Sequence, residues 1–225
     1  MLNTKSITCQ HCLFKALCDQ QAHSDVDYKP DTTHLEPGET LCVKGSQLTK
    51  LYAIKAGTLK AITSDGYIMG FYSQGDVVGL DGLNQKEHQV NLVAVENTLL
   101  CTFKYNEFYE ELIQSPEMVQ SLIPLLGHQM SRQVNYHLHH KDAEHKFCQF
   151  ILDISKKKKQ YGFCERTFYL PMQYKDIANH LDVKTETLSR TISAINKKGY
   201  LTIKNKLVKI NDLNMLRQKI ETVAH

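Results

Sequence analysis

The sequence predicts an α+β protein that begins with a β-sandwich or barrel and ends in a mostly helical block. Two observations support this prediction. Eight of the 11 glycines fall between Gly38 and Gly82, where they separate short runs of strand-forming residues. From Tyr105 onward, the apolar residues instead recur at helical spacing. A chain of 225 residues has room for two such domains.

The composition is that of an ordinary globular protein. Hydrophobic residues make up 42% and charged residues 23% of the chain, which excludes wholesale disorder. The sequence has no apolar run near the ~18 residues of a membrane span, and its first residues contain no apolar stretch of signal-peptide length. We therefore expect a cytoplasmic protein that does not contact a membrane. Because the cytosol keeps thiols reduced, its seven cysteines need an explanation other than disulfides.

The glycine-rich part contains seven predicted strands with regular turn signals, as in a sandwich or barrel. They cover residues 40–43, 51–54, 58–63, 67–72, 76–80, 90–95 and 98–103. Between the third and fourth of them, Ser64-Asp65-Gly66 is typical of a hairpin turn, because Asp-Gly readily supplies positive φ.

Two helices follow the strands. The first is predicted over residues 105–114, and a longer one begins with Ser115 as N-cap and Pro116 in the first turn. The long helix has the alternating 3,4 spacing of a two-stranded coiled coil. Its seam positions are Ile123, Leu126, Met130, Gln133 and His137. This seam predicts a homodimer, although a helix buried within its own chain would have a similar pattern.

The strongest local pattern, over residues 174–193, predicts a helix-turn-helix. Five apolar residues have the spacing of that motif: Ile177, Leu181, Val183, Leu188 and Ile192. Ala178 is small where the two helices would cross, and Asp182 tolerates the left-handed backbone of the turn. Residues 200–204 and 207–210, joined at Asn205-Lys206, predict a β-hairpin wing.

The second helix of this motif would expose an N-terminal face of the kind that enters the major groove of DNA. The face consists of Thr185, Glu186, Ser189 and Arg190. Arginine can donate two hydrogen bonds to guanine, and glutamate can accept one from cytosine. Nearby cations are placed to meet phosphates, which position the protein without reading sequence: Lys184, Lys197, Lys204 and Lys206. The alternative is a surface ion pair between Glu186 and Arg190 at i,i+4 spacing.

The charge distribution agrees with DNA binding by the second part of the chain. Residues 1–140 carry 10 Lys and Arg against 15 Asp and Glu, a balance of −5. Residues 141–225 carry 17 against 9, a balance of +8, so the total of +3 hides the contrast. A basic half beside an acidic one is typical of proteins that contact nucleic acid. Because one recognition helix is short, we expect a dimer on a palindromic site.

Three cysteines lie close together near the start of the chain, at Cys9, Cys12 and Cys18, in a segment with little core of its own. Four thiolates complete an iron–sulfur cluster or an all-cysteine zinc site, so a fourth is needed. The candidates are Cys101, Cys42, Cys148 and Cys164. The first two both lie on predicted strands, and the pattern alone leaves Cys101 barely ahead of Cys42. Zinc would serve structure, whereas an iron–sulfur cluster would serve the sensing of dioxygen or nitric oxide.

These motifs together resemble the Crp/Fnr superfamily of transcription regulators, and within it the iron–sulfur oxygen sensors of the Fnr branch. Cys9-x2-Cys12-x5-Cys18 has the cysteine spacing of that branch. Residues 51–58 and 74–79 resemble its β-roll motifs, and residues 96–101 resemble the strand that carries its fourth cysteine. Glu186-Thr-Leu-Ser-Arg190 matches the recognition-helix pattern Glu-x-x-Ser-Arg. The resemblance covers nearly the full length of the chain.

The resemblance implies a more detailed fold than the pattern alone. It implies an N-terminal jelly-roll domain of the cyclic-nucleotide-binding type, a long dimerisation helix and a C-terminal winged helix-turn-helix. The corresponding parts are a cysteine-rich cluster-binding segment (1–22), a β-roll sensory domain (23–114), the dimerisation helix (115–141) and the DNA-binding domain (142–225).

The resemblance also implies a function. Cys9, Cys12, Cys18 and Cys101 would bind a 4Fe–4S cluster in the absence of oxygen, which favours Cys101 over Cys42. Oxygen would convert the cluster and shift the dimer toward monomer. In the cluster-bound dimer, Glu186, Ser189 and Arg190 would bind half-sites like TTGAT in a palindromic operator. RNA polymerase is an implied partner, although the loop at residues 64–66 is shorter than the family loop that helps to contact it.

Other functions on this fold are disfavoured by particular residues. A cyclic-nucleotide receptor needs a glutamate where Leu80 stands and an arginine for the phosphate, and no arginine precedes Arg132. A haem-based sensor does not use the cysteine triad. A cupin-like metalloenzyme needs converging ligands, and His34 and His88 are isolated, so we expect no enzyme activity. The main alternative is a zinc-stabilised or cluster-independent DNA-binding regulator.

Overall fold

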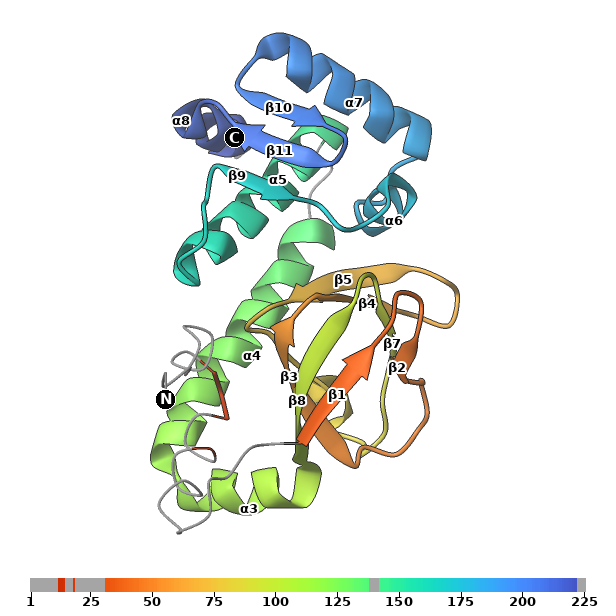
Figure 1. The fold of residues 1–225 in the computed structure, drawn as a ribbon, viewed down its shortest axis with the longest axis vertical. Helices are drawn as coiled ribbons and strands as arrows, with labels where there is room; N and C mark the ends of the chain where they lie inside the picture. The colour runs from red at the N-terminus through yellow and green to blue at the C-terminus, as the bar shows by residue number, and fades with distance from the viewer. Residues whose placement is uncertain (1–11, 15–17, 19–30, 138–141, 222–225) are drawn as a thin grey trace. The chain divides into compact units, whose positions relative to one another are not determined.

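The computed structural model describes residues 12–14, 18, 31–137 and 142–221, which Figure 1 shows as a ribbon. The chain forms two compact units, Met1–Gln133 and Val134–His225. The first contains two β-sheets and the second is mainly helical, so the predicted α+β class is confirmed. In the part of the chain described, no helix combines the length and apolarity needed to cross a membrane.

The first unit is built on two four-stranded antiparallel sheets, with strand orders β1-β8-β3-β6 and β2-β7-β4-β5. The strands are β1 (Asp31–Leu35), β2 (Thr40–Cys42), β3 (Lys50–Ala56), β4 (Thr58–Ile62), β5 (Ile68–Ser73), β6 (Val77–Val78), β7 (Asn91–Ala94) and β8 (Thr98–Lys104). Apolar side chains from both sheets form one buried cluster, which includes Ile54, Leu59 and Leu100. This arrangement confirms the predicted sandwich.

Strand β1 is the strand of the first unit that the sequence pattern did not predict. It pairs with β8 from Asp31 opposite Thr102 to Leu35 opposite Thr98. Only Leu35 of its five residues is buried, so the strand lacks the alternating apolar pattern that marks a half-buried strand. Instead its side chains are partly held by polar contacts, such as the 2.9 Å hydrogen bond between the hydroxyls of Thr33 and Thr102.

Two glycines fix the turns on either side of β4. Gly57 has φ +93°, and a Cβ there would lie 2.5 Å from the backbone oxygen of Asn97, so only glycine fits between β3 and β4. Gly66 has φ +85° in the turn between β4 and β5, which pair antiparallel. The hairpin predicted at Ser64-Asp65-Gly66 is therefore confirmed.

Helices complete the first unit. A short 3-10 helix η1 (Leu80–Gly82) follows β6, and α3 (Tyr105–Gln114) and α4 (Pro116–His137) follow β8. Ser115 caps α4, because its hydroxyl accepts a 3.3 Å hydrogen bond from the backbone N–H of Met118. Both helices pack on the β1-β8-β3-β6 sheet through a second buried cluster, which includes Phe103, Phe108, Met118 and Leu122.

The second unit contains four helices and a small antiparallel sheet of order β10-β11-β9 among its described residues. Its elements are α5 (Ala143–Gln160), β9 (Thr167–Tyr169), α6 (Tyr174–His180), α7 (Thr185–Lys198), β10 (Leu201–Lys204), β11 (Leu207–Ile210) and α8 (Leu213–Glu221). Phe147, Cys148 and Ile151 of α5 are fully buried in its core. Cys148, one of the candidate fourth ligands, is therefore a core residue of this unit.

Candidate DNA-binding surface and cysteine site

Helices α6 and α7 form the predicted helix-turn-helix. Asp182 in the turn has φ +51°, the left-handed conformation that was predicted for this position. The turn closes with a 3.0 Å hydrogen bond from the backbone N–H of Val183 to the carbonyl of Ala178. Ile177 and Leu188, one from each helix, are completely buried, so the two helices share one apolar contact surface.

The N-terminal face of α7 carries the side chains expected to contact bases. Thr185, Glu186, Ser189 and Arg190 are all exposed, because the buried residues Leu188, Ile192 and Ile195 turn the opposite face inward. Within the part of the chain that the structure describes, neither Glu186 nor Arg190 belongs to an ion pair. Their polar groups are therefore available to a ligand, and the alternative of a Glu186–Arg190 surface pair is not realised.

The wing lies between β10 and β11, where Asn205 and Lys206 both have positive φ, at 49° and 65°. Two consecutive left-handed residues are typical of the tight hairpin turn that suits twisted strands. Lys204 on this hairpin is exposed, as are Lys184 and Lys197 at the ends of α7. Lys206 is half-buried and donates a 3.5 Å hydrogen bond from Nζ to the carbonyl of Pro171, so it is the least accessible of the four lysines.

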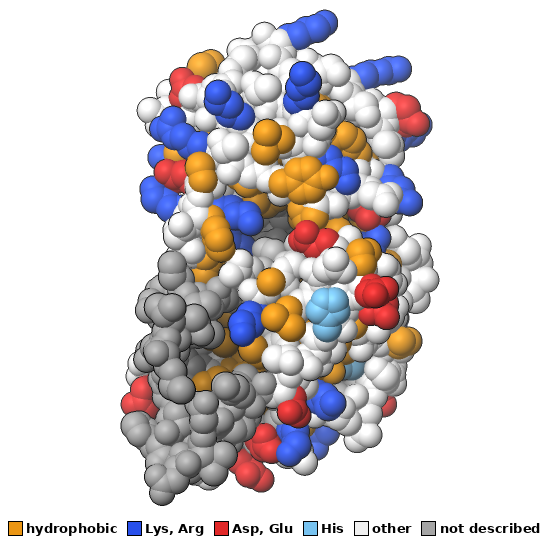
Figure 2. All heavy atoms as spheres, in the orientation of Figure 1, with side chains coloured by type: hydrophobic (Ala, Val, Ile, Leu, Met, Phe, Trp, Pro, Cys, Tyr) orange, Lys and Arg blue, Asp and Glu red, His pale blue; other side chains and the backbone are white. Residues whose placement is uncertain are grey.

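Positive charge gathers on this unit. On the face drawn in Figure 2, lysine and arginine side chains predominate over the C-terminal unit, whereas the N-terminal unit shows mixed charge. This distribution agrees with the sequence balance of +8 over residues 141–225. A basic surface around an exposed helix face provides the electrostatic attraction that DNA phosphates require.

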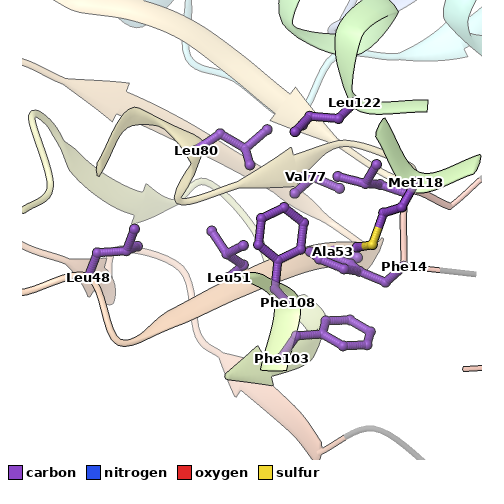
Figure 3. Close-up of a cluster of buried hydrophobic side chains, with 11 residues drawn as sticks. Phe14, Leu48, Leu51, Ala53, Val77, Leu80, Phe103, Phe108, Met118 and Leu122 are labelled. Atoms are coloured by element: carbon purple, nitrogen blue, oxygen red, sulfur yellow. The ribbon is translucent and has the colours of Figure 1, made fainter. Parts of the chain in front are cut away.

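The cysteine segment is anchored in the core of the first unit. Leu13 is 6% exposed and Phe14 is fully buried, against β8 and the helices that follow it (Figure 3). The ring of Phe14 stacks on Phe103 with centroids 3.9 Å apart and meets Phe108 edge-on at 5.7 Å. The segment has little core of its own, as expected, and these two residues dock it onto the core of the β unit.

Three of the predicted ligands border the apolar cluster that receives Phe14. Cys12, Cys18 and Cys101 are all half-buried and pack against the same apolar cluster as Phe14. Cys9 lies outside the described residues. Among the residues described, no three His, Cys, Asp or Glu side chains converge closely enough to hold a metal ion. The thiol donors therefore suit an iron–sulfur cluster by their chemistry, and the three described ones border one apolar core.

The other cysteines lie elsewhere. Cys42 is 6% exposed in the cluster between the two sheets, a different core from the one that Cys101 borders. Cys148 belongs to the second unit, where burial raises the pKa of its thiol to about 11. Cys164 is exposed, also in the second unit. Of the four candidates, Cys101 alone borders the apolar core against which Cys12 and Cys18 pack. Only the tertiary contacts distinguish it from Cys42, because both lie on strands.

The seam predicted on α4 is only partly exposed. Ile123 is 63% exposed and Met130 is 69% exposed, as expected for side chains that could meet a partner helix. Leu126 is half-buried and packs against the Phe14 cluster of its own chain. Gln133 and His137 belong to the helix, but their side chains lie outside the described residues. Part of the seam therefore serves the chain's own core, and part is available to a second copy.

The β domain also contains a small cavity. Its volume is about 170 Å³, and its lining is apolar apart from groups such as Tyr72, Asp81 and Gln89. Asp81 is the one charged residue among those that line it. A cavity with an acidic group and no lysine or arginine offers no counter-charge to an anionic phosphate.

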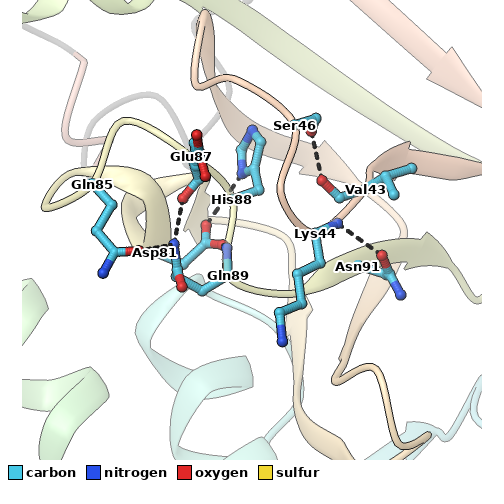
Figure 4. A network of polar contacts seen from close by, with 9 residues as sticks. All are labelled: Val43, Lys44, Ser46, Asp81, Gln85, Glu87, His88, Gln89 and Asn91. Atoms are coloured by element: carbon cyan, nitrogen blue, oxygen red, sulfur yellow. Dashed lines mark hydrogen bonds and ion pairs between the residues drawn. The ribbon is translucent and has the colours of Figure 1, made fainter.

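Next to this cavity, the half-buried Asp81 forms an ion pair with the buried His88 (Figure 4). The imidazole Nδ1 lies 3.5 Å from the carboxylate, and His88 is 4% exposed. The second carboxylate oxygen accepts a 2.8 Å hydrogen bond from the backbone N–H of Gln89. The interaction with Asp81, assisted by Cys42, raises the pKa of His88 to about 10 although burial opposes this.

This ion pair predicts how stability depends on pH. A histidine whose pKa is raised on folding stabilises the protein fully below its unfolded pKa of about 6.5, and loses this contribution as pH rises through about 10. We expect Asp81→Asn to reduce the free energy of unfolding at pH 7 and to flatten its fall toward pH 10. Urea unfolding followed by circular dichroism from pH 6 to 10.5 measures this, with His34→Gln as the control at an exposed histidine. A wild-type-to-variant difference that stays constant across this range would contradict the assignment.

A two-sheet β domain, a long helix and a basic winged helix-turn-helix define a DNA-binding transcription regulator rather than an enzyme. Residues 32–115 match the cyclic nucleotide-binding domain family, and residues 145–219 match the Crp-like helix-turn-helix domain family. The chain belongs to the Crp/Fnr family of transcription regulators. It is 30% identical over 229 residues to the fumarate and nitrate reduction regulatory protein of Escherichia coli K12, covering 95% of this chain and 90% of that one.

Other comparisons agree. The fumarate nitrate reduction regulatory protein of Klebsiella oxytoca is also 30% identical, with the same coverage of both chains. Among solved structures, FixK2 from Bradyrhizobium japonicum superposes with a TM-score of 0.76 at 19% identity, over 85% of this chain and 97% of that one. A CooA mutant from Carboxydothermus hydrogenoformans gives 0.66 at 14% identity, over 92% and 94%. These two structures support the fold alone.

Proposed function

We propose that this regulator responds to oxygen through a 4Fe–4S cluster held by Cys9, Cys12, Cys18 and Cys101. The observation that carries the proposal is that Cys12, Cys18 and Cys101 all pack against one group of buried apolar side chains. That apolar group also contains Met118 and Leu122, near the start of α4. The similarity to fumarate and nitrate reduction regulatory proteins supports it, because their names refer to the use of oxidants other than oxygen.

The cluster, when bound, would supply a centre that dioxygen or nitric oxide attacks. The chain's own residues would provide the thiolates and a largely apolar wall. Leu13 and Phe14 seat the cysteine segment on that wall and exclude water from its inner side. Zinc would suit the same thiolates, and a zinc-stabilised regulator without sensing remains the second candidate on that chemistry.

The link from the cysteines to dimerisation would run through α4. Phe14 belongs to the same cluster as Met118 and Leu122, which lie in the first two turns of that helix. A change in how the cysteine segment is held would therefore change the contacts of the helix that exposes Ile123 and Met130. A ligand can shift an equilibrium only through such differential contacts. We propose that the cluster-bound form favours the homodimer.

The dimer would present two recognition helices to a palindromic, TTGAT-like operator. Glu186, Ser189 and Arg190 would contact base edges, with Thr185 beside them. Phosphates would be met by Lys184, Lys197 and Lys204, and more weakly by Lys206. Because two half-sites are bound together, a modest shift toward dimer would change operator occupancy strongly. RNA polymerase would be the partner through which occupancy acts on transcription, giving an aerobic–anaerobic switch.

A cyclic nucleotide is not the expected effector, although residues 32–115 match the cyclic nucleotide-binding domain family. In the cavity of the β domain, the one charged lining residue is acidic. An anionic cyclic phosphate would find no bidentate cation among the lining residues, and the Asp81 carboxylate is already paired with His88. We therefore propose that the β domain here serves as the scaffold for the cysteine site.

The cysteine assignment is tested by two matched substitutions. We expect wild-type protein purified without oxygen to be brown, with iron and acid-labile sulfide bound. We expect Cys101→Ala to be colourless and Cys42→Ala to keep the colour, because Cys42 lies in the core between the sheets. Visible absorption with iron and zinc analysis measures both. A colourless wild type with one zinc per chain would overturn the proposal in favour of the second candidate.

A further inference from the structure

The recognition helix α7 is held at its C-terminal end by the first turn of α5. The carboxylate of Glu144 accepts hydrogen bonds of 2.6 and 2.8 Å from Nζ of Lys198, the last residue of α7. It also accepts a 2.8 Å hydrogen bond from the hydroxyl of Tyr200, which is 2% exposed. Partial burial would raise the pKa of Glu144, but the hydrogen bonds from Lys198 and Tyr200 outweigh it and lower the pKa.

The same turn also holds α6. Lys146 donates a 3.0 Å hydrogen bond from Nζ to the carbonyl of Leu181, at the C-terminal end of α6. A cation at this position also complements the helix dipole. The turn itself is stabilised by Asp142, whose carboxylate caps α5 by accepting a 2.7 Å hydrogen bond from the backbone N–H of His145. One turn of α5 therefore fixes the ends of both helices of the DNA-binding motif.

Two further contacts fasten the same end of α7 to the wing. The side-chain amide of Asn196 exchanges two hydrogen bonds with the backbone of Ile203, of 3.0 and 2.7 Å. The side chain of Asn211 donates a 2.8 Å hydrogen bond to the carbonyl of Gly199. Toward its other end α7 packs on α6 through the buried Leu188, so the polar contacts at the C-terminal end supply the second point that sets the direction of the helix.

The length of α7 makes this anchoring important for the recognition of DNA bases, because a small tilt at one end moves the other end by several ångströms. Helix α7 has 14 residues, so it is about 21 Å long. A tilt of about 10° at the anchored end would move the other end by roughly 4 Å over that length. Hydrogen bonds to base edges tolerate only a few tenths of an ångström. Loss of one anchor can therefore misplace Arg190 and Glu186 without unfolding the domain.

We propose that Glu144 is a positioning residue for sequence-specific DNA recognition, which sets the orientation of α7 through Lys198 and Tyr200. This role rests on DNA binding by the helix-turn-helix and is independent of the iron–sulfur proposal. Because Glu144 belongs to the first turn of α5, the segment that follows α4 in the chain leads directly into the anchor. The hydrogen bonds of Glu144 thus connect the start of α5, which follows the dimerisation helix in the chain, to the recognition helix.

The test compares full-length wild-type protein with Glu144→Gln, both prepared without oxygen. The operator is the duplex that the wild type enriches from a randomised pool, and a scrambled duplex of equal length measures non-specific binding. We expect Glu144→Gln to lower operator affinity by roughly tenfold and to leave non-specific affinity and its salt dependence unchanged, because the phosphate-binding lysines remain. Tyr200→Phe, which removes one of the bonds, should show a smaller loss in the same direction.

Two variants separate positioning from stability. Glu165→Gln breaks an exposed ion pair with Lys159 at 3.3 Å in the same unit and should leave the operator-to-scrambled ratio unchanged. The exchange Glu144→Lys with Lys198→Glu should recover part of the ratio. The proposal is overturned if Glu144→Gln lowers the melting temperature but not the ratio, if Glu165→Gln has the same effect, or if the exchange recovers nothing.

Discussion

Replacing Arg190 with alanine is expected to weaken operator binding by about 2–6 kcal/mol, because each of two half-sites loses a bidentate contact to guanine of ~1–3 kcal/mol. The lower figure already corresponds to roughly thirtyfold in affinity. Arg190 is exposed on α7 and belongs to no ion pair among the described residues. We therefore expect the free energy of unfolding to stay within about 0.5 kcal/mol of the wild type. Fluorescence anisotropy with labelled operator measures the loss.

The pattern of the loss distinguishes base reading from phosphate binding. Arg217→Ala on α8 is the matched control, because it removes an exposed arginine from the same unit away from α7. We expect it to weaken binding to all duplexes slightly and equally. If Arg190→Ala also weakened binding equally for operator and scrambled DNA, Arg190 would be a phosphate contact and the base-reading assignment would be wrong.

Replacing Phe14 with alanine is expected to destabilise the N-terminal unit by about 3–5 kcal/mol, the range for removing a buried aromatic side chain. Phe14 is fully buried, stacks on Phe103 and meets Phe108 edge-on. The substitution would leave a cavity between the cysteine segment, β8 and the two following helices. Urea unfolding followed by far-ultraviolet circular dichroism measures the change. We also expect the variant to retain less iron, because Cys12 and Cys18 would no longer be seated beside Cys101.

An exposed aromatic residue provides the comparison for Phe14. Phe163 is 46% exposed, with Nζ of Lys158 5.2 Å from its ring centre. We expect Phe163→Ala to cost at most about 1 kcal/mol, since an exposed cation–π contact contributes ~0.5–1 kcal/mol. If Phe14→Ala were as mild as Phe163→Ala, the cysteine segment would not be seated in the core, and the route from the cysteines to α4 would lose its basis.

The helix-turn-helix was predictable because its determinants are local. Ile177 and Leu188 have the spacing of two crossing helices, and Asp182 and Asn205 are residue types that accept left-handed backbone. These features depend on neighbours within a few residues along the chain, so the pattern specifies them completely. Strand β1 was missed for the opposite reason, since a single buried residue at Leu35 gives no period to detect.

The cysteine site was only partly predictable because it depends on contacts between distant segments. Cys42 and Cys101 both lie on strands and have similar sequence surroundings. Strand pairing and packing assign them to different apolar clusters, which no local pattern reveals. Phe14 was missed in the same way, although two large apolar residues between cysteines were a signal that the segment is docked. Half-burial of Leu126 shows that the α4 seam is shared with the chain's own core.

We propose that loss of the iron–sulfur cluster releases DNA through loss of the dimer. The most direct measurement follows one anaerobic sample of wild-type protein before and after exposure to air, by visible absorption, sedimentation velocity and operator anisotropy. We expect operator affinity and the dimer fraction to fall together as the visible absorption bleaches. Operator affinity and dimer fraction that stay unchanged while the absorption bleaches would contradict it.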